Sequence, residues 1–149
     1  MDTQWLSEDE EQAWRAFRRM LTALPARLGR DLAQDSGLSP ADFEVLSTLS
    51  EKPGHRWALK DLAAKMEWSR SRLSHHASRM ESRGLVDKEP DPHDARGCIL
   101  HLTDRGDAVL EAAAHHHLVS VRRRFVDHLS RDELAILCDV SARIAELPD

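Results

Sequence analysis

The stretch WSRSRLSHHASRMESRGLV, residues 68–86, is the most informative part of this sequence. It predicts a helix, because Ser69 can cap its beginning and Gly84 can end it in a left-handed conformation. At about 100° per residue, its apolar side chains fall on one side and predict a buried face formed by Leu73, Ala77 and Met80. The opposite side and its flanks carry hydroxyl, imidazole and guanidinium groups, from Ser71, Arg72, Ser74, His75, Ser78, Arg79 and Ser82.

The outward side of this helix has the chemistry of a surface that enters a nucleic-acid groove. Residues 68–83 carry four arginines and one acid, whereas the alternative, a solvated amphipathic helix, usually mixes both signs. Small hydroxyl side chains let the helix approach closely, and arginines can bind phosphates or a guanine edge. The major groove, about 12 Å wide, admits one helix. We therefore expect DNA contacts from Ser69, Arg70, Ser71, Arg72, Ser74, His75, Ser78 and Arg79, with those from Ser69 to His75 deepest in the groove.

The overall charge does not by itself suggest a nucleic-acid partner, since the 149 residues carry a net charge of −5. The charge is uneven, however, because residues 55–105 hold 10 basic and 8 acidic side chains while the segments on both sides are acidic. Local positive charge is what phosphate binding requires. The chain has no run of 18 apolar residues, and its acidic start is unlike a signal peptide. We expect a cytoplasmic protein without a membrane partner.

Catalysis, a cofactor and a disulfide are not expected. Ser74 and His75 are neighbours on the predicted helix and diverge by about 100°, so they cannot act as nucleophile and base. No glycine-rich elbow accompanies them. The two cysteines, Cys98 and Cys138, belong to no paired motif, and the cytoplasm keeps thiols reduced. We expect Cys138 on the apolar stripe of the last helix, where burial would make its thiol inert.

The rest of the chain reads as helices with one short β-hairpin. A first helix begins at the capping box of Ser7 and Glu10, and Pro25 is expected to kink it. Further helix starts are marked by Ser39 followed by Pro40, by Thr103, and by the capping box of Ser130 and Glu133. A tight turn near residue 67 joins the helix described above to a preceding short helix, whose predicted inner face is Leu59, Leu62, Ala63 and Met66.

The hairpin is predicted between residues 85 and 103. Residues 85–89 and 98–103 alternate as strands do, and the prolines, aspartates and glycine between them are typical of a hairpin tip. Arg96 at this tip can enter a narrow minor groove, and His93 can contact a phosphate. Asp94 can either hold the Arg96 guanidinium or cap the turn. An ordinary charged hairpin tip is the alternative.

A helix-turn-helix followed by a hairpin is a winged helix, so the expected fold is mainly α with a small β-hairpin wing. The sequence resembles the MarR family of bacterial transcription regulators over nearly its whole length. The resemblance is carried by the wing signature Asp94, Arg96, Leu102 and Thr103, and by LKDLAAKMEWSRSRLSHHASRMESRGLV, residues 59–86. It implies a homodimer that binds a palindromic operator in double-stranded DNA, often repressing nearby genes. It also implies a small-molecule effector that releases the protein from DNA.

Dimerisation is expected from the helices outside the winged lobe as well. We treat residues 1–149 as one domain, with the DNA-binding lobe at 39–105 and dimerisation helices at 1–38 and 106–149. These helices carry apolar stripes that they cannot easily cover for one another, and a second copy would bury them. Obligate interfaces of this kind often exceed about 2,000 Å². A twofold dimer would present two recognition helices about 34 Å apart, one turn of DNA.

Several modes of sensing remain open. In one, an anionic or aromatic ligand enters between the dimerisation helices and the DNA-binding lobe, where Trp14, Phe17 and Phe43 could line a cleft with Arg18 near it. The alternative is that these residues belong to the core or the surface. The run His115–His117 suggests metal, but neighbouring helical positions diverge and metal pairs need i and i+4 spacing, so no metal site is expected. Redox-sensing members of the family place a reactive cysteine in the first helix, where this sequence has none. A winged-helix protein–protein adaptor that has lost DNA binding is the alternative from another functional class.

Overall fold

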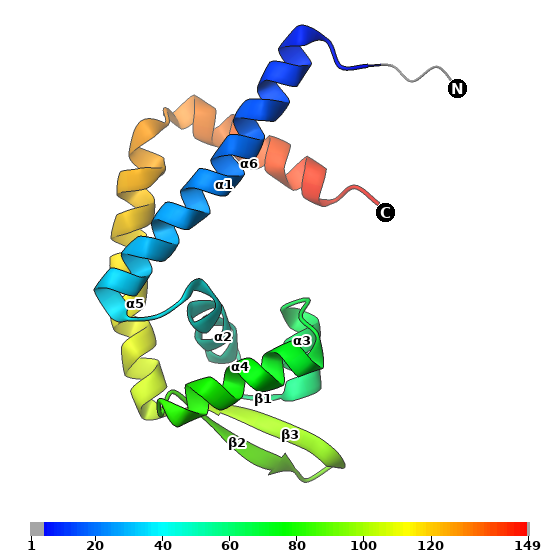
Figure 1. Cartoon of the computed structure of the whole chain (residues 1–149), viewed down its shortest axis with the longest axis vertical. Coiled ribbons are helices and arrows are strands. Elements are labelled where there is room, and N and C mark those ends of the chain that lie inside the picture. The colour runs from blue at the N-terminus through cyan, green and yellow to red at the C-terminus, as the bar shows by residue number, and fades with distance from the viewer. Residues whose placement is uncertain (1–4, 149) are drawn as a thin grey trace. The chain divides into compact units, whose positions relative to one another are not determined.

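The computed structural model describes residues 5–148, and this part of the chain forms six α-helices, three β-strands and one 3₁₀ helix (Figure 1). In chain order they are α1 (Glu8–Ser36), α2 (Pro40–Ser50), β1 (Arg56–Ala58), α3 (Leu59–Lys65), α4 (Arg70–Ser82), β2 (Val86–Asp91), β3 (Asp94–Leu102), α5 (Asp104–Arg124), η1 (Val126–His128) and α6 (Arg131–Ala145). The chain divides into two compact units. One consists of the described residues of 1–31 and 117–149, and the other of residues 32–116.

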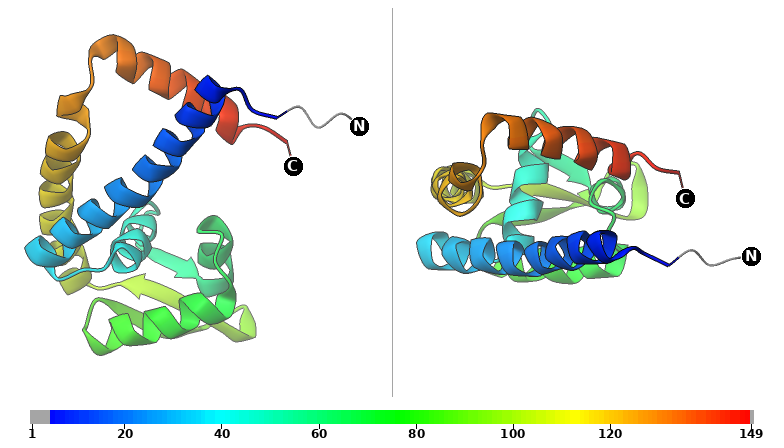
Figure 2. Two further views of the ribbon diagram at one scale, coloured as in Figure 1. Left: turned by 45° about the horizontal axis from the view of Figure 1, so that its top comes forward. Right: turned by 90° about the horizontal axis from the view of Figure 1, so that it is seen from above.

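The unit of residues 32–116 contains a three-stranded antiparallel sheet in the order β1-β3-β2 (Figure 2). Leu100 of β3 pairs with Trp57 of β1 on one side and with Lys88 of β2 on the other. The helix-turn-helix of α3 and α4 precedes the β2–β3 hairpin, which confirms the predicted mainly α fold with a small wing. Strand β1 is an addition to that prediction, because its three residues are too few to show an alternating pattern.

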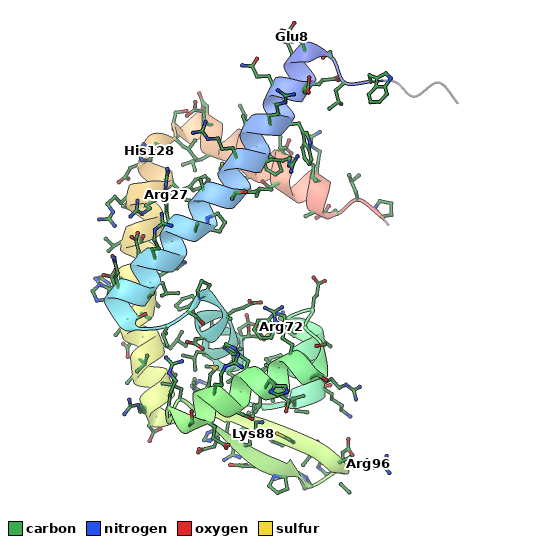
Figure 3. The ribbon with its side chains drawn as sticks, in the orientation of Figure 1. Glu8, Arg27, Arg72, Lys88, Arg96 and His128 are labelled. Atoms are coloured by element: carbon green, nitrogen blue, oxygen red, sulfur yellow. The ribbon has the colours of Figure 1, made fainter. Side chains whose placement is uncertain are left out.

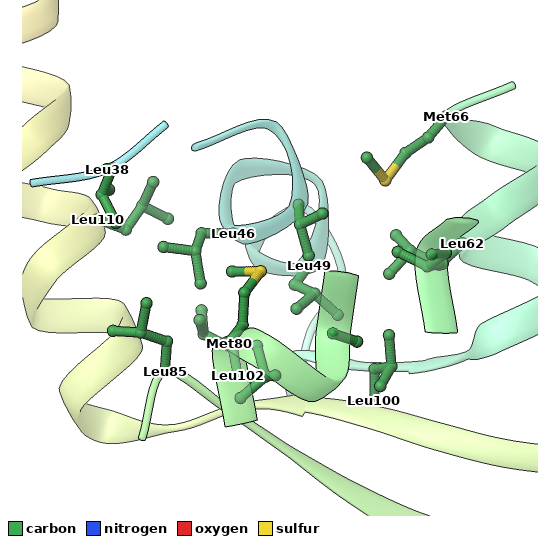
Figure 4. Close-up of a cluster of buried hydrophobic side chains, with 14 of the residues drawn as sticks. Leu38, Leu46, Leu49, Leu62, Met66, Met80, Leu85, Leu100, Leu102 and Leu110 are labelled. Carbon is green, nitrogen blue, oxygen red and sulfur yellow. The ribbon is translucent and has the colours of Figure 1, made fainter. Parts of the chain in front are cut away.

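The core of this unit joins its helices to its sheet (Figure 4). Leu73, Ala77 and Met80 of α4 are each 0 % exposed, which confirms the predicted inner face of that helix. They share the core with side chains from α2, α3, the strands and α5, including Leu46, Leu49, Leu62, Val86, Leu100, Leu102 and Leu110. Burying a side chain of this size contributes roughly 1.5–3 kcal/mol, so the core holds α4 firmly against the sheet.

The β2–β3 hairpin is longer than predicted, and its turn is confined to residues 92–93. Asp91 and Asp94 close this turn, because their carboxylates accept the backbone N–H groups of His93 at 2.9 Å and Arg96 at 3.0 Å. Pairing of Asp91 with Asp94 and of Pro90 with Cys98 leaves residues 95–97 unpaired in a bulge. Arg96 therefore lies in a bulge of β3 rather than in a loop at the tip.

The start of α5 is joined closely to the end of α4. The hydroxyl of Thr103 accepts the backbone N–H of Gly106 at 3.0 Å, as the predicted cap requires, and donates to the carbonyl of Gly84 at 2.7 Å. A Cβ atom on Gly106 would lie 2.1 Å from the carbonyl oxygen of Leu85. Only glycine lets α5 come this close to the chain that enters β2.

The other unit contains α1 to residue 31, α5 from residue 117, η1 and α6. α1 begins with the predicted capping box and continues without interruption across Pro25. The buried carboxylate of Asp31 accepts hydrogen bonds from Arg124 at 2.6 and 2.7 Å and from the hydroxyl of Ser120, which ties α1 to α5. Among the described residues, no helix is both long and apolar enough to cross a lipid bilayer.

Candidate nucleic-acid interface

Helix α4 begins and ends as its sequence predicts. The hydroxyl of Ser69 accepts the backbone N–H of Arg72 at 3.1 Å, and Gly84 follows the helix with φ of +74°. The tight turn before it contains Glu67 with φ of +56°, an uncommon conformation for a residue with a side chain. The buried inner face and these two ends leave one side of α4 directed away from the core.

That side carries the predicted contact residues. Seven of the eight are exposed, namely Ser69, Arg70, Ser71, Arg72, His75, Ser78 and Arg79, and Ser74 is half-buried. Small side chains and guanidinium groups thus share one surface, as close approach to a duplex requires.

Two of the arginines are oriented by contacts within this unit. The guanidinium of Arg72 lies over the Trp68 ring, 3.6 Å from its centroid, which is a cation–π arrangement. On the same flank, about two turns further along α4, Nη2 of Arg79 lies 3.0 Å from Nδ1 of His76. The remaining nitrogen of this imidazole, Nε2, lies 2.8 Å from a carboxylate oxygen of Asp42 in α2.

Arg83 belongs to the cationic stretch, but its guanidinium is engaged by α2 and the residues before it. Its guanidinium donates to the carboxylate of Asp42 at 2.7 Å and to the carbonyl of Gly37 at 3.2 Å. Burial raises the pKa of Asp42, but the hydrogen bonds from Arg83 and from the Ser39 backbone, with the nearby cations, outweigh this and leave the pKa below its usual value. Sequence reasoning missed this pair, because the two residues are 41 positions apart.

Lys88 of β2 is a further cation that sequence reasoning missed (Figure 3). Its ammonium group donates to the hydroxyl of Ser78 at 2.6 Å and to the carbonyl of Ser74 at 3.0 Å. The Glu81 carboxylate accepts the backbone N–H of Lys88 at 2.9 Å. These bonds fasten the wing to α4, and they engage Ser78, which the sequence predicts to be free for DNA.

The wing carries the remaining predicted contacts. Asp94 caps the turn through the backbone of Arg96, which decides between its two predicted roles. The side chains of His93 and Arg96 are exposed, and Figure 3 shows Arg96 near the outer end of the hairpin. Such a guanidinium is free to reach a phosphate or a groove floor.

A hollow of about 590 Å³ lies between the first turn of α4 and the bulge of β3. Its lining brings together predicted residues from both elements, Arg70, Ser71, Ser74, His75, Asp94 and Arg96. It also includes Lys60 of α3, which sequence reasoning missed because nothing but its charge distinguishes it. Three cationic side chains with hydroxyl donors suit the phosphates of one DNA strand.

The residues predicted to bind an effector are divided between the two units. The rings of Trp14 and Phe17 have centroids 6.1 Å apart on α1, and Trp14 and Arg18 line a hollow of about 580 Å³. Phe43 lies in the other unit, where it packs half-buried against the core. Sequence reasoning missed a second hollow of about 540 Å³, in which Arg27 and His128 (Figure 3) accompany Leu24 and Phe125.

The histidine and cysteine alternatives gain little support. In the described residues, no group of three or more His, Cys, Asp or Glu side chains is arranged to hold a metal ion. Cys98 lies in β3 as predicted, and burial raises the pKa of its thiol. The prediction of a buried Cys138 is wrong for the single chain, because this residue is exposed on α6.

Comparison with known proteins identifies the family. Residues 36–97 match the model of the MarR family. AbsC, a MarR family transcriptional regulator from Streptomyces coelicolor, is 40 % identical and superposes with a TM-score of 0.87 over 97 % of both chains. Sco3205, from the same organism and family, was crystallised in complex with DNA. It is 34 % identical, with a TM-score of 0.89 over 97 % of this chain and 91 % of its own.

A curated relative agrees with these structures. The transcriptional regulator HosA of Escherichia coli O111:H- is 32 % identical over 123 residues, which are 82 % of this chain and 86 % of HosA. A transcription regulator of this kind is a DNA-binding protein and not an enzyme. The resemblance stated from the wing and helix-turn-helix sequences is therefore confirmed, and the chain belongs to the MarR family of winged helix-turn-helix transcription regulators.

Proposed function

We propose that this regulator inserts α4 into the major groove of its operator and places the bulge of β3 in the neighbouring minor groove. The observation that carries the proposal is the exposed side of α4, where guanidinium and small hydroxyl groups adjoin the bulge across one hollow. Residues near the helix start, Ser69 to His75, would read bases. Arg79, His93 and Lys60 would bind phosphates, and Arg96 the minor groove, with Asp94 holding the turn.

We propose further that two copies form the DNA-binding species. In the unit of residues 1–31 and 117–149, large apolar side chains are exposed at Trp14, Phe17, Leu21, Leu118, Val119, Ile136 and Ile144. Single apolar side chains on a surface are ordinary, but a series spread over three helices is typical of an interface. A second copy with the same stripes is the simplest occupant, and a twofold pair would match a palindromic operator.

The regulator is proposed to repress genes near its own, and to leave the operator when a small molecule binds. An organic anion suits the hollow beside Trp14 and Arg18, where an aromatic surface adjoins a cation. Binding to the chromosome would place the protein in the cytoplasm. Because the family is one of DNA-binding regulators, a winged-helix adaptor without DNA binding is not proposed.

The direct test is a mobility shift with a duplex that covers the DNA upstream of the protein's own coding sequence. Arg72→Ala and Arg79→Ala should each weaken binding at least about fivefold, or about 1 kcal/mol. Their thermal melts should change little, since the stack on Trp68 contributes only about 0.5–1 kcal/mol at an exposed site. Arg143→Ala removes the same charge from α6 and should leave binding unchanged. Unchanged binding by both α4 variants would remove the support for this orientation of the helix.

Salt dependence provides a second readout from the same assay. Each phosphate neutralised by a cation releases counterions, so log affinity should fall linearly with log salt, with a slope of about −0.9 per phosphate. A variant that has lost one phosphate contact should show a slope that is smaller in magnitude by about one. A flat dependence, or no shifted band at low salt, would contradict the proposed phosphate contacts.

A further inference from the structure

His76 is a nearly buried residue of α4 that lies between a carboxylate and an arginine of the DNA-facing flank. Its side chain is 12 % exposed. Nε2 lies 2.8 Å from Oδ1 of Asp42, and Nδ1 lies 3.0 Å from Nη2 of Arg79. The proposed DNA contacts do not include His76, because it faces α2 and not the outward surface.

The chemistry of the three groups fixes where the imidazole carries its proton. A guanidinium can only donate, so Nδ1 must accept the hydrogen bond from Arg79 with its lone pair. The ring is then neutral with its proton on Nε2, and this N–H donates to Asp42. The same carboxylate also accepts the Ser39 backbone N–H at 3.0 Å and the Arg83 guanidinium at 2.7 Å. Both ring nitrogens of His76 then have a partner of the matching kind.

The surroundings prevent the ring from turning to another arrangement. The edge of the imidazole and the Trp68 ring meet at 86°, with centroids 5.7 Å apart. The charged groups that contact His76 are Asp42 of α2 and Arg79 of its own helix, and Arg83 binds the other oxygen of the same Asp42 carboxylate. Asp42 is itself held by the capping box of α2, so the imidazole is anchored to a rigid helix start.

We propose that His76 is a positioning residue that holds the Arg79 guanidinium in place for a phosphate. The inference rests on the proposed function and names the residue that prepares one of its contacts. Arg79 is exposed, and a free arginine would lose side-chain entropy on binding DNA. The bond to Nδ1 restricts the guanidinium before DNA arrives and leaves its other N–H groups available. Asp42 thereby acts on the DNA surface through His76 without touching DNA.

A proton added to His76 would reverse the contact with Arg79. Nδ1 would become a donor that faces another donor, with two positive charges adjacent, whereas the bond from Nε2 to Asp42 would persist. The contact with Arg79 therefore exists only while Nδ1 carries a lone pair and no proton.

The test is a double-mutant cycle on DNA affinity with full-length protein and the upstream duplex. His76→Gln keeps an amide N–H near the position of Nε2, toward Asp42, but offers no acceptor at the position of Nδ1. It should weaken binding about two- to tenfold when Arg79 is present, which is the cost of ordering one long side chain. In an Arg79→Ala background the same change should have an effect of less than about twofold. His76→Asn keeps a carbonyl oxygen near Nδ1 and should retain most of the affinity while losing thermal stability.

A structural role alone would give a different pattern. Equal losses from His76→Gln in the wild-type and Arg79→Ala backgrounds, or affinity equal to wild type, would overturn the inference. Nitrogen-15 NMR of free wild-type protein at neutral pH should show His76 with its proton on Nε2, and a proton on Nδ1 would overturn it independently. If the duplex binds and Arg79→Ala weakens binding while His76→Gln does not, only this inference fails. If wild type does not bind the duplex at all, the proposed function fails with it.

Discussion

Arg96 is the residue on the wing whose role in DNA binding is most directly open to test. Its exposed guanidinium extends from a bulge that Asp94 fixes through the Arg96 backbone. Arg96→Ala should weaken binding by about 1–3 kcal/mol if the side chain enters a groove, with no change in thermal stability. Fluorescence anisotropy with the upstream duplex measures this. Arg96→Lys should recover only part of the loss, since lysine cannot bind in a fork. Wild-type affinity for Arg96→Ala would leave the wing with a structural role.

Asp31 should make the unit of α1 and α5 sensitive to acid. Hydrogen bonds from Arg124 and then Ser120 outweigh the opposing effect of burial and hold the pKa of Asp31 well below its usual range. Because the folded pKa is lower than the unfolded one, the stabilising effect is complete above the ordinary value of 3.8 and is lost as the pH falls below it.

Denaturant unfolding measured between neutral pH and about pH 3 tests this expectation. Asp31→Asn should be less stable than wild type at neutral pH, and the difference should shrink as the pH falls below about 4. Glu146→Gln changes an exposed carboxyl elsewhere in this unit and serves as the control. A difference between wild type and Asp31→Asn that does not vary with pH would contradict the assigned cause.

At the residue scale, the sequence predicts what depends on near neighbours. The caps at Ser69 and Gly84 and the inner face of α4 follow from spacing within one helix, and the structure confirms them. The pairing of Asp42 with Arg83 depends on how α2 lies against α4, which spacing cannot express. The cationic stretch therefore supplies one arginine fewer to the outward surface than its composition suggests.

At the scale of elements, Gly106 should not tolerate a side chain. A Cβ there would lie 2.1 Å from the carbonyl oxygen of Leu85 and 2.8 Å from Leu102. Gly106→Ala should therefore destabilise the unit by about 1–3 kcal/mol or more, although alanine usually favours a helix. Thermal unfolding measures the loss, with Asp107→Ala at the next, exposed position as the control. A melt equal to wild type would show that α5 can shift away from the strand without cost.

The boundaries of the hairpin strands could not be predicted accurately from the sequence. Its prolines, aspartates and glycine predict a long tip, yet two aspartates close the turn early and extend the strands past it. The extra residues are taken up by the bulge at 95–97. Turn-forming residues indicate that the chain reverses direction, but the hydrogen bonds that their side chains form determine the length of the turn.

At the scale of the whole molecule, the central expectation is that the exposed apolar residues pair two copies. Leu118 on α5 is 67 % exposed. Leu118→Glu should give a monomer by light scattering after gel filtration, and should bind the upstream duplex weakly, because one copy can occupy only half a palindrome. His116→Glu adds the same charge about 200° away around the helix and should remain dimeric. A dimeric Leu118→Glu variant would show that the interface lies elsewhere.

At the scale of the whole molecule, one sequence cannot show whether an apolar face is buried by its own chain. Cys138 lies on the apolar stripe of α6, and the pattern correctly finds that stripe. Whether its own chain covers the stripe depends on the position of the neighbouring helices. In the single chain Leu134 and Leu137 are half-buried, while Cys138 and Ile144 are exposed. A periodic pattern shows that a face is apolar but not which molecule covers it.

One consequence of α6 concerns the amount of protein in the cell. In the described chain, none of the residues of this helix is fully buried, so its own polypeptide stabilises it only in part. If another copy supplies the missing contacts, mass action links folding to abundance, and the melting temperature should rise with each increase in protein concentration. In a cell that makes few copies, a larger fraction of the regulator would then be unfolded and open to degradation. The amount of folded regulator would therefore rise more steeply than its rate of synthesis.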